Sequence, residues 1–235
     1  FPFATVVAEE YGRGSGNSTP VIESTGSGGG MKLFCAGIGL EHPDITNASR
    51  RIKKSEFDKC QANGIDMTEF VIGYDGIVVA NSNSGAKLNL TLGQLFQAVA
   101  AKVPSSEATN DDCKLIDNPH TKWSDIDDSL PNISIEVLGP PPTSGTRDAF
   151  VELAMEGGAK SFECLNAMKK ADKKKWEAVA HGMREDGKWI DAGENDNLMV
   201  SKLVANPDAV GVFGFSFLDQ NSDTIKGTNI NGISP

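Results

Sequence analysis

The spacing of apolar and polar positions changes several times along the chain and predicts both helices and strands. Residues 3–11 (FATVVAEEY) repeat apolar side chains with helical spacing and carry an acidic outer face. Residues 91–103 (TLGQLFQAVAAKV) show the same amphipathic pattern, with Thr91 as a suitable N-cap. A helix over residues 54–63 would end at Gly64, and further helices are expected along SGTRDAFVELAMEGG and NDNLMVSKLVANP.

Continuous apolar runs between these helices predict strands. The most apolar run, EFVIGYDGIVVANS, extends from Glu69 to Ser82 and predicts a buried strand interrupted near Gly73 to Gly76. Other strand signals lie at residues 20–23, at Trp123, at residues 133–138 and along AVGVFGFSFL. Because strands alternate with helices, the pattern favours an α/β fold with mainly parallel sheets flanked by helices.

Length and composition are those of a globular protein. The 235 residues suffice for one large domain or two smaller lobes, and 39% hydrophobic with 23% charged residues is an ordinary balance. No stretch approaches the roughly 18 consecutive apolar residues of a membrane helix. Residues 1–11 lack the basic start and long apolar core of a signal peptide, so we expect none within this chain.

The charge balance restricts the partners. A net charge of −10 disfavours nucleic acid and anionic membranes as main partners, although directed hydrogen bonds can still bind a small anion. The lysine-rich residues 169–175 are therefore predicted to form a solvated helix face. The scattered histidines and the absence of H-E-x-x-H and G-x-S-x-G motifs indicate no metal site, no cofactor and no catalytic set.

The four cysteines are Cys35, Cys60, Cys113 and Cys164, and they form no C-x-x-C motif. Four cysteines allow three pairings, of which Cys35–Cys60 with Cys113–Cys164 closes one loop in each half of the chain. Disulfides would place the protein in an oxidising compartment. The alternative is four reduced, buried thiols.

Two loops share a composition typical of anion-binding helix starts. Residues 24–30 (STGSGGG) enter a helix expected at about Met31, and residues 143–146 (TSGT) enter one expected at about Arg147. The first turn of a helix has unpaired N–H groups and a partial positive charge, glycines allow close approach, and hydroxyls add donors. Each loop alone also fits an ordinary capped helix start, and neither has dinucleotide-binding or P-loop spacing.

Charged residues near these loops are candidates for the remaining contacts. Arginine binds an oxyanion through a planar fork of donors, so Arg50 and Arg147 are candidate ligands, whereas Arg51 is expected to form a surface ion pair. Asp75 lies inside the apolar run, where a carboxylate needs a partner. It could accept the proton of HPO₄²⁻; the alternative is a turn aspartate.

Six segments in this order resemble the periplasmic phosphate-binding proteins of phosphate ABC importers: FPFATVVAEEYG, ESTGSGGGMKLFCAGIG, DITNASRRIK, VIGYDGIVVAN, GPPPTSGTRDAF and ENDNLMVSKLVANPDAVGVFGFSF. The resemblance spans almost the whole chain. It implies a two-lobed type II periplasmic-binding-protein fold, cut short at both ends, that closes on phosphate between its lobes without catalysis. It further implies a monomeric periplasmic receptor that delivers phosphate to a membrane permease.

The expected lobes are residues 1–77 and 78–235, with a hinge near residues 76–80. Two further functions remain open beside phosphate transport. One is a receptor for sulfate, molybdate or tungstate. The other is a phosphatase-like hydrolase that uses the same loops.

The resemblance also implies particular ligands and shows departures from the family. One branch has an aspartate where Arg50 stands and an arginine where Pro140 to Pro142 stand, so Arg147 is expected to compensate, as in another branch. Asp75 then becomes the candidate proton acceptor. The phosphate-binding set that follows is Phe1 (through its backbone N–H), Ser27, Gly28 with Gly29, Arg50, Asp75, Ser144, Gly145, Thr146 and Arg147.

Overall fold

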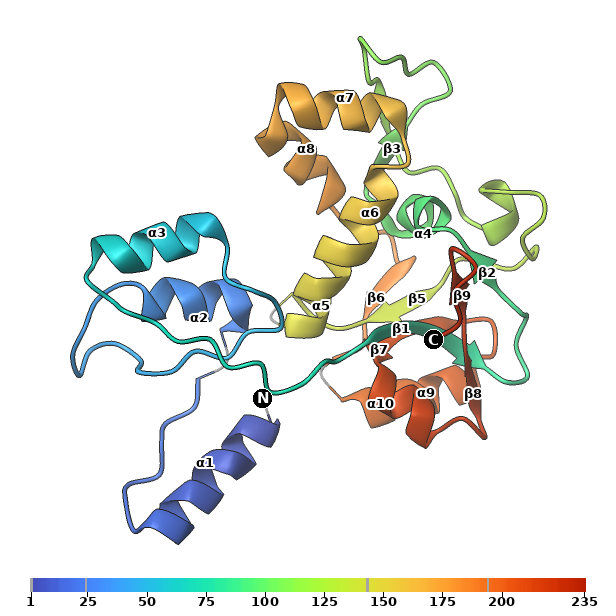
Figure 1. Cartoon of the computed structure of the whole chain (residues 1–235). Helices are drawn as coiled ribbons and strands as arrows, with labels where there is room; N and C mark the ends of the chain where they lie inside the picture. Colours follow the sequence, from blue (N-terminus) through green and yellow to red (C-terminus); the bar gives the residue numbers. More distant parts are fainter. Residues whose placement is uncertain (1, 24, 143, 194) are drawn as a thin grey trace. The chain divides into compact units, whose positions relative to one another are not determined.

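The computed structural model describes residues 2–23, 25–142, 144–193 and 195–235. The chain divides into two compact units, Phe1–Val71 and Ile72–Pro235, called unit one and unit two below (Figure 1). Among the described residues, no helix is long and apolar enough to cross a membrane.

Unit one contains the helices α1 (Pro2–Ser15), α2 (Gly26–Phe34) and α3 (Lys54–Ala62). The last of these agrees closely with the sequence prediction, and Gly64 has the positive φ of 69° that suits a helix stop. Two predictions are wrong. Residues 20–23 form no strand, and α2 begins at Gly26 instead of Met31, so that the glycine run lies inside the helix.

A disulfide forms the centre of unit one. Cys35 and Cys60 are bonded and fully buried, and they pack with Ile65 and the partly buried Phe34 and Met67. The bond joins the end of α2 to α3, so it fixes the helix that carries Ser27.

Unit two is built on a five-stranded sheet with the order β6-β5-β7-β1-β8 (Figure 1). Strand β5 is parallel to both β6 and β7, whereas β1 is antiparallel to β7 and to β8. The predicted α/β class is confirmed, and the sheet proves to be mixed. The strands are β1 (Ile77–Ser82), β5 (Val137–Gly139), β6 (Trp189–Asp191), β7 (Val210–Gly214) and β8 (Ile225–Gly227).

Two small sheets extend unit two. Strand β2 (Asn89–Leu90) pairs in parallel with β9 (Asn229–Ile230), and β3 (Lys102–Pro104) pairs antiparallel with β4 (Leu115–Asp117). The strand signal at Trp123 is wrong, because residues Trp123–Asp125 form a 3₁₀ turn, η1, with the indole fully buried.

Helices cover both faces of the large sheet. Val79 of β1 joins an apolar cluster with α4 and α6–α8, while Val78 and Ala80 join a second cluster with α9 and α10. Thr91 caps α4 by accepting a hydrogen bond from Gln94 N at 3.1 Å, as predicted. The helices are α4 (Leu92–Val99), α5 (Gly145–Phe150), the π-helical turn η2 (Val151–Met155), α6 (Glu156–Ala159), α7 (Glu163–Ala171), α8 (Lys173–Ala180), α9 (Asp196–Ala205) and α10 (Phe215–Gln220).

The second disulfide joins Cys113, just before β4, to Cys164 in the first turn of α7. Both bonds match the nearest-neighbour pairing that was one of the three considered. The lysine-rich residues 169–175 lie at the junction of α7 and α8, where Lys170 and Lys173–Lys175 are exposed, as predicted.

Only the second half of the most apolar run forms a strand. Ile77–Ser82 is β1, which obtains partners on both sides in β7 and β8. Residues 69–76 belong to no strand, and the side chains of Phe70, Ile72 and Tyr74 are 80–99% exposed. The prediction of a buried strand from residue 69 is therefore wrong, since hydrophobicity alone supplies no hydrogen-bonding partner.

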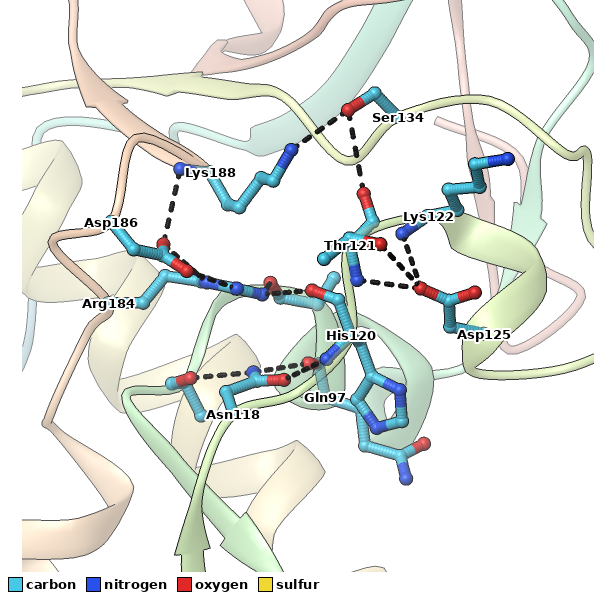
Figure 2. A network of polar contacts seen from close by, with 12 residues as sticks. Gln97, Asn118, His120, Thr121, Lys122, Asp125, Ser134, Arg184, Asp186 and Lys188 are labelled. Carbon is cyan, nitrogen blue, oxygen red and sulfur yellow. Dashed lines mark hydrogen bonds and ion pairs between the residues drawn. The ribbon is translucent and has the colours of Figure 1, made fainter.

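A buried arginine holds the segment that leads into β6. The Arg184 guanidinium donates to the carbonyl oxygens of Ala98 and His120 at 3.1 and 2.8 Å, and it pairs with the Asp186 carboxylate (Figure 2). Asp186 Oδ1 also accepts from Lys188 N at 3.3 Å. These contacts fix the turn from which Trp189 and Asp191 follow.

Candidate anion-binding site

The carboxyl ends of three parallel strands define one edge of the large sheet. Strands β5, β6 and β7 end there at Gly139, Asp191 and Gly214. Because β1 is antiparallel, it begins at the same edge, with Ile77 opposite Gly214. Ligands of open α/β sheets bind outside the carboxyl ends of the strands, so this edge is the candidate site of unit two.

Ser144 begins the helix that follows β5. Its Oγ accepts a hydrogen bond from Thr146 N at 3.2 Å, and its own N–H donates to Pro141 O at 3.0 Å. The side chain is only 6% exposed, and a Cβ placed on Gly145 would meet no other atom within 4 Å. Helical backbone then runs on through Ala159. The hydroxyl proton of Ser144 and the first-turn N–H groups can therefore donate to an anion.

Arg147 lies in the first turn of this helix. One of its terminal nitrogens donates to Pro140 O at 3.2 Å, and its guanidinium lies over the Trp189 ring, 4.7 Å from the ring centroid. Burial lowers the pKa of Arg147, while the carboxylates of Asp191 and Asp148 act in the opposite direction. An arginine remains charged under such a shift, so it supplies a cation at the sheet edge.

Asp75 is exposed and precedes β1. A Cβ placed on Gly214 would lie 3.8 Å from Asp75 Oδ1, so the carboxylate is beside the end of β7. Asp75 is thus exposed and not buried within the apolar run as the sequence had predicted. Its position beside Gly214 nevertheless puts it at the edge of the sheet where β5, the strand before Ser144, also ends.

In unit one, Ser27 lies in the first turn of α2 and is 5% exposed. Its Oγ accepts from Ser49 N at 3.1 Å and lies 3.1 Å from Ser49 Oγ. A Cβ on Gly28 would lie 3.7 Å from an Arg50 guanidinium nitrogen. Three predicted residues, Ser27, Gly28 and Arg50, therefore lie together at the start of α2.

Arg50 is already engaged by a carboxylate. Its two terminal nitrogens donate to Glu56 at 2.9 and 2.8 Å, and one also donates to Arg51 O at 3.0 Å. The Arg50 guanidinium holds the pKa of the Glu56 carboxyl below its usual value. Much of the positive charge of Arg50 is thus neutralised within unit one.

The predicted residues fall into three groups. Unit two brings five of them to one sheet edge or its adjoining helix, and unit one brings three, with Gly29 next to them in the chain, to the start of α2. Phe1 lies outside the described residues, as do Ser24 and Thr143 of the two predicted loops. The unit-two group is Asp75, Ser144, Gly145, Thr146 and Arg147; the unit-one group is Ser27, Gly28 and Arg50.

Four further residues contact or lie near the candidates and were not predicted from the sequence. Trp189 lies under Arg147, Asp191 is its electrostatic partner, Ser49 bonds Ser27, and Glu56 binds Arg50. The segment KWIDAG carried a usable signal, because an apolar stretch that is followed by Asp and Gly is typical of a strand end. Nothing in the sequence indicated that this strand end lies beside Arg147.

The described residues also include an apolar pocket that does not suit an anion. No cluster of three metal-ligating side chains is found among these residues. An apolar pocket of about 390 Å³ lies among β1, α4, α5 and the last residues of the chain. Its lining includes Val79, Leu95 and Ile233, and a charged donor is absent from it, so this pocket is a poor anion site.

Comparison with known proteins places the chain in a family. A model described as a PBP superfamily domain matches residues 1–233. Protein SphX of Synechococcus elongatus is 30% identical over 226 residues, covering 96% of this chain and 54% of SphX. The phosphate-binding protein PstS of Staphylococcus saprophyticus is 26% identical over 226 residues, covering 96% of this chain and 56% of PstS.

Solved structures agree with the fold. A structure described as a possible phosphate binding protein from Planctomyces limnophilus is 26% identical with a TM-score of 0.64, covering 100% of this chain and 70% of that one. An ABC-type phosphate transport receptor from Vibrio cholerae is 17% identical with a TM-score of 0.56, covering 98% and 72%, and supports the fold alone.

The chain therefore belongs to the PBP superfamily and is related to PstS and SphX proteins. The expectation of a binding-protein family instead of an enzyme family is confirmed by this membership. The chain spans little more than half the length of the curated relatives named here.

Proposed function

We propose that this protein binds inorganic phosphate and delivers it to the permease of an ABC importer. The observation that carries the proposal is the helix start at Ser144, where a buried hydroxyl, first-turn N–H groups and the Arg147 guanidinium adjoin the carboxyl edge of β5. The relatives named as phosphate-binding proteins support the choice of anion.

The binding chemistry would consist of directed hydrogen bonds with little net charge. Ser144 and Thr146 supply hydroxyls, the first helical turn supplies backbone N–H groups, and Arg147 supplies a charged fork. In unit one, Ser27, Gly28 and Arg50 are proposed as further phosphate ligands, with Arg50 contributing less charge than Arg147 because Glu56 already engages it. Such a site binds an anion even though the whole chain carries a net charge of −10.

Asp75 would distinguish phosphate from sulfate. An ionised carboxylate can only accept hydrogen bonds, so it needs a proton on the ligand. HPO₄²⁻ has one at neutral pH and sulfate has none, so sulfate would leave two negative groups in contact. Asp75→Asn should therefore weaken phosphate binding and narrow the difference between the affinities for phosphate and sulfate.

Location and motion are part of the same proposal. The two disulfides are typical of an extracytoplasmic protein, and we propose the periplasm. We also propose that the protein acts as a monomer with a hinge near residues 76–80, between the lobes 1–77 and 78–235, and that this hinge moves when phosphate binds. Small-angle scattering with and without phosphate tests this motion.

Isothermal titration with phosphate and with sulfate tests the proposed function. The protein should bind one phosphate, and Ser144→Ala should weaken binding about tenfold to a hundredfold, since a hydrogen bond to a charged group contributes about 1.5–3 kcal/mol. Ser105→Ala is a matched control, because Ser105 Oγ also accepts from a backbone N–H two residues on, at 3.2 Å, but Ser105 follows β3, which is not a strand of the large sheet.

Three results would overturn parts of the proposal. Equal affinity for phosphate and sulfate, or no heat of binding with either anion, would contradict the assignment of phosphate as the ligand. Tighter binding of sulfate, molybdate or tungstate identifies another oxyanion receptor. A phosphomonoesterase activity that co-purifies with the protein would instead favour the phosphatase-like alternative.

A further inference from the structure

The indole ring of Trp189 supports the arginine of the proposed site. The Arg147 guanidinium carbon lies 4.7 Å from the ring centroid, within the range of a cation–π contact. One guanidinium nitrogen also donates to Pro140 O at 3.2 Å. Together the ring and the carbonyl restrain the position of the guanidinium.

The ring itself is held by packing against the sheet. Trp189 is the first residue of β6, is 7% exposed, and has its ring centroid 5.4 Å from that of Phe150. A Cβ on Gly139 would overlap the ring, so the glycine at the end of β5 is what admits it. Within the described residues Trp189 Nε1 has no hydrogen-bond partner, so the position of the ring depends on its shape.

The geometry leaves the donors of Arg147 available. The guanidinium carbon lies over the Trp189 ring, and the hydrogen bond to Pro140 O uses one of the five N–H donors of the guanidinium. Contact with the ring and hydrogen bonding to an oxyanion can therefore occur together. A lysine ammonium lacks the planar fork of donors that allows two-point contact with an oxyanion.

We propose that Trp189 is a positioning residue for Arg147 and that it raises the affinity of the site for phosphate. A restrained side chain loses less conformational freedom when a ligand binds, so more of its hydrogen-bond energy appears as affinity. This inference rests on the proposed function, because phosphate affinity is its main readout.

The first measurement is phosphate affinity by isothermal titration. Trp189→Leu removes the aromatic face and should raise the Kd for phosphate about 3- to 30-fold, whereas Trp189→Phe keeps a face and should stay within about threefold of wild type. Trp176→Leu is a matched control. Trp176 is also buried and also lies under a cation, Lys169 at 3.9 Å, but it belongs to α8. That control should leave the Kd unchanged.

A second measurement separates positioning from general structural support. Arg147→Ala alone should weaken phosphate binding, and adding Trp189→Leu to it should cause no further loss. If Trp189 only supported the fold, its removal would weaken binding equally with and without Arg147. Equal losses in the two backgrounds would overturn the inference.

A third measurement needs no ligand. A dicarbonyl reagent modifies exposed arginines, and mass spectrometry gives the rate at Arg147. Trp189→Leu should increase this rate, and an unchanged rate would overturn the inference. If the wild-type protein fails to bind phosphate, the proposed function falls while the modification rate still decides whether Trp189 orients Arg147. If Arg147→Ala weakens binding and Trp189→Leu does not, only the inference falls.

Discussion

Removing the disulfide between Cys35 and Cys60 is expected to unfold unit one while unit two stays folded. The bond lies at the centre of a small cluster in which Ile65 is the other fully packed apolar residue. Unit two instead has two extensive apolar clusters, one on each face of its sheet. The same chemical change should therefore have different consequences in the two units.

The size of the effect follows from the loops that the bonds close. The separations are 25 residues for Cys35–Cys60 and 51 for Cys113–Cys164. Loop-closure entropy then gives about 3.5 kcal/mol for the first bond and about 4 kcal/mol for the second at 25 °C. Burying one Met or Ile side chain contributes about 1.5–3 kcal/mol. In unit one, the loss is comparable to the contribution of Met31 and Ile65 together.

Two probes distinguish the units. The three tryptophans, Trp123, Trp176 and Trp189, all lie in unit two, so tryptophan fluorescence reports the unfolding of that unit. Hydrogen exchange of peptides from α2 and α3 reports unit one. A Cys35→Ala/Cys60→Ala variant should lose protection in these peptides and keep its fluorescence transition. A Cys113→Ala/Cys164→Ala variant should keep unit-one protection and shift the fluorescence transition downward.

Persisting protection of α2 and α3 in the Cys35→Ala/Cys60→Ala variant would refute the reasoning. It would mean that apolar packing in unit one is worth more than its few buried side chains indicate. An equal shift of the fluorescence transition in both variants would refute it in another way, since the two units would then unfold together.

Two further predictions concern charged groups. Arg184→Met should lower the thermal midpoint of unit two by about 2–12 °C, because the carbonyl oxygens of Ala98 and His120 lose their donor, which costs about 1–3 kcal/mol. Arg13→Met, at a side chain 67% exposed, is the control, and an equal shift in that variant would contradict this prediction. The lowered pKa of Glu56 means that the Arg50–Glu56 pair stabilises unit one above about pH 4.5 and that this stability is lost as pH falls through the lower folded-state pKa. Hydrogen exchange of α3 peptides, measured as a function of pH, should show this loss of stability in the wild type and not in Glu56→Gln. Identical pH profiles for the two proteins would contradict the prediction.

Local patterns predicted the elements whose stability is itself local. Thr91 caps α4, Gly64 follows α3, and the apolar spacing of residues 3–11 forms a helix, because each depends on contacts within a few residues. The glycine run of α2 was misjudged, because glycine is a poor helix former and only packing against the rest of unit one favours its helical form.

In the candidate site, too, locally determined features could be predicted and long-range contacts could not. Ser144 and Thr146 could be named from the sequence, since a hydroxyl-rich loop before a helix has a local meaning. The partners of Arg147 and Arg50 could not. Trp189 is 42 residues from Arg147 in the sequence, and pairing across strands brings them together. Glu56 is near Arg50 in sequence, but only the turn into α3 directs its carboxylate back.

The sequence by itself determined the α/β class, most helices, the hydroxyl and glycine residues of the two loops, and the resemblance to phosphate-binding proteins. Tertiary structure alone decided which half of the run from Glu69 to Ser82 is a strand. It also decided that β1 runs against its parallel neighbours, which puts Asp75 at the edge where β5, β6 and β7 end. The physical reason is that strand pairing and burial depend on partners distant in sequence, and a single segment does not encode them.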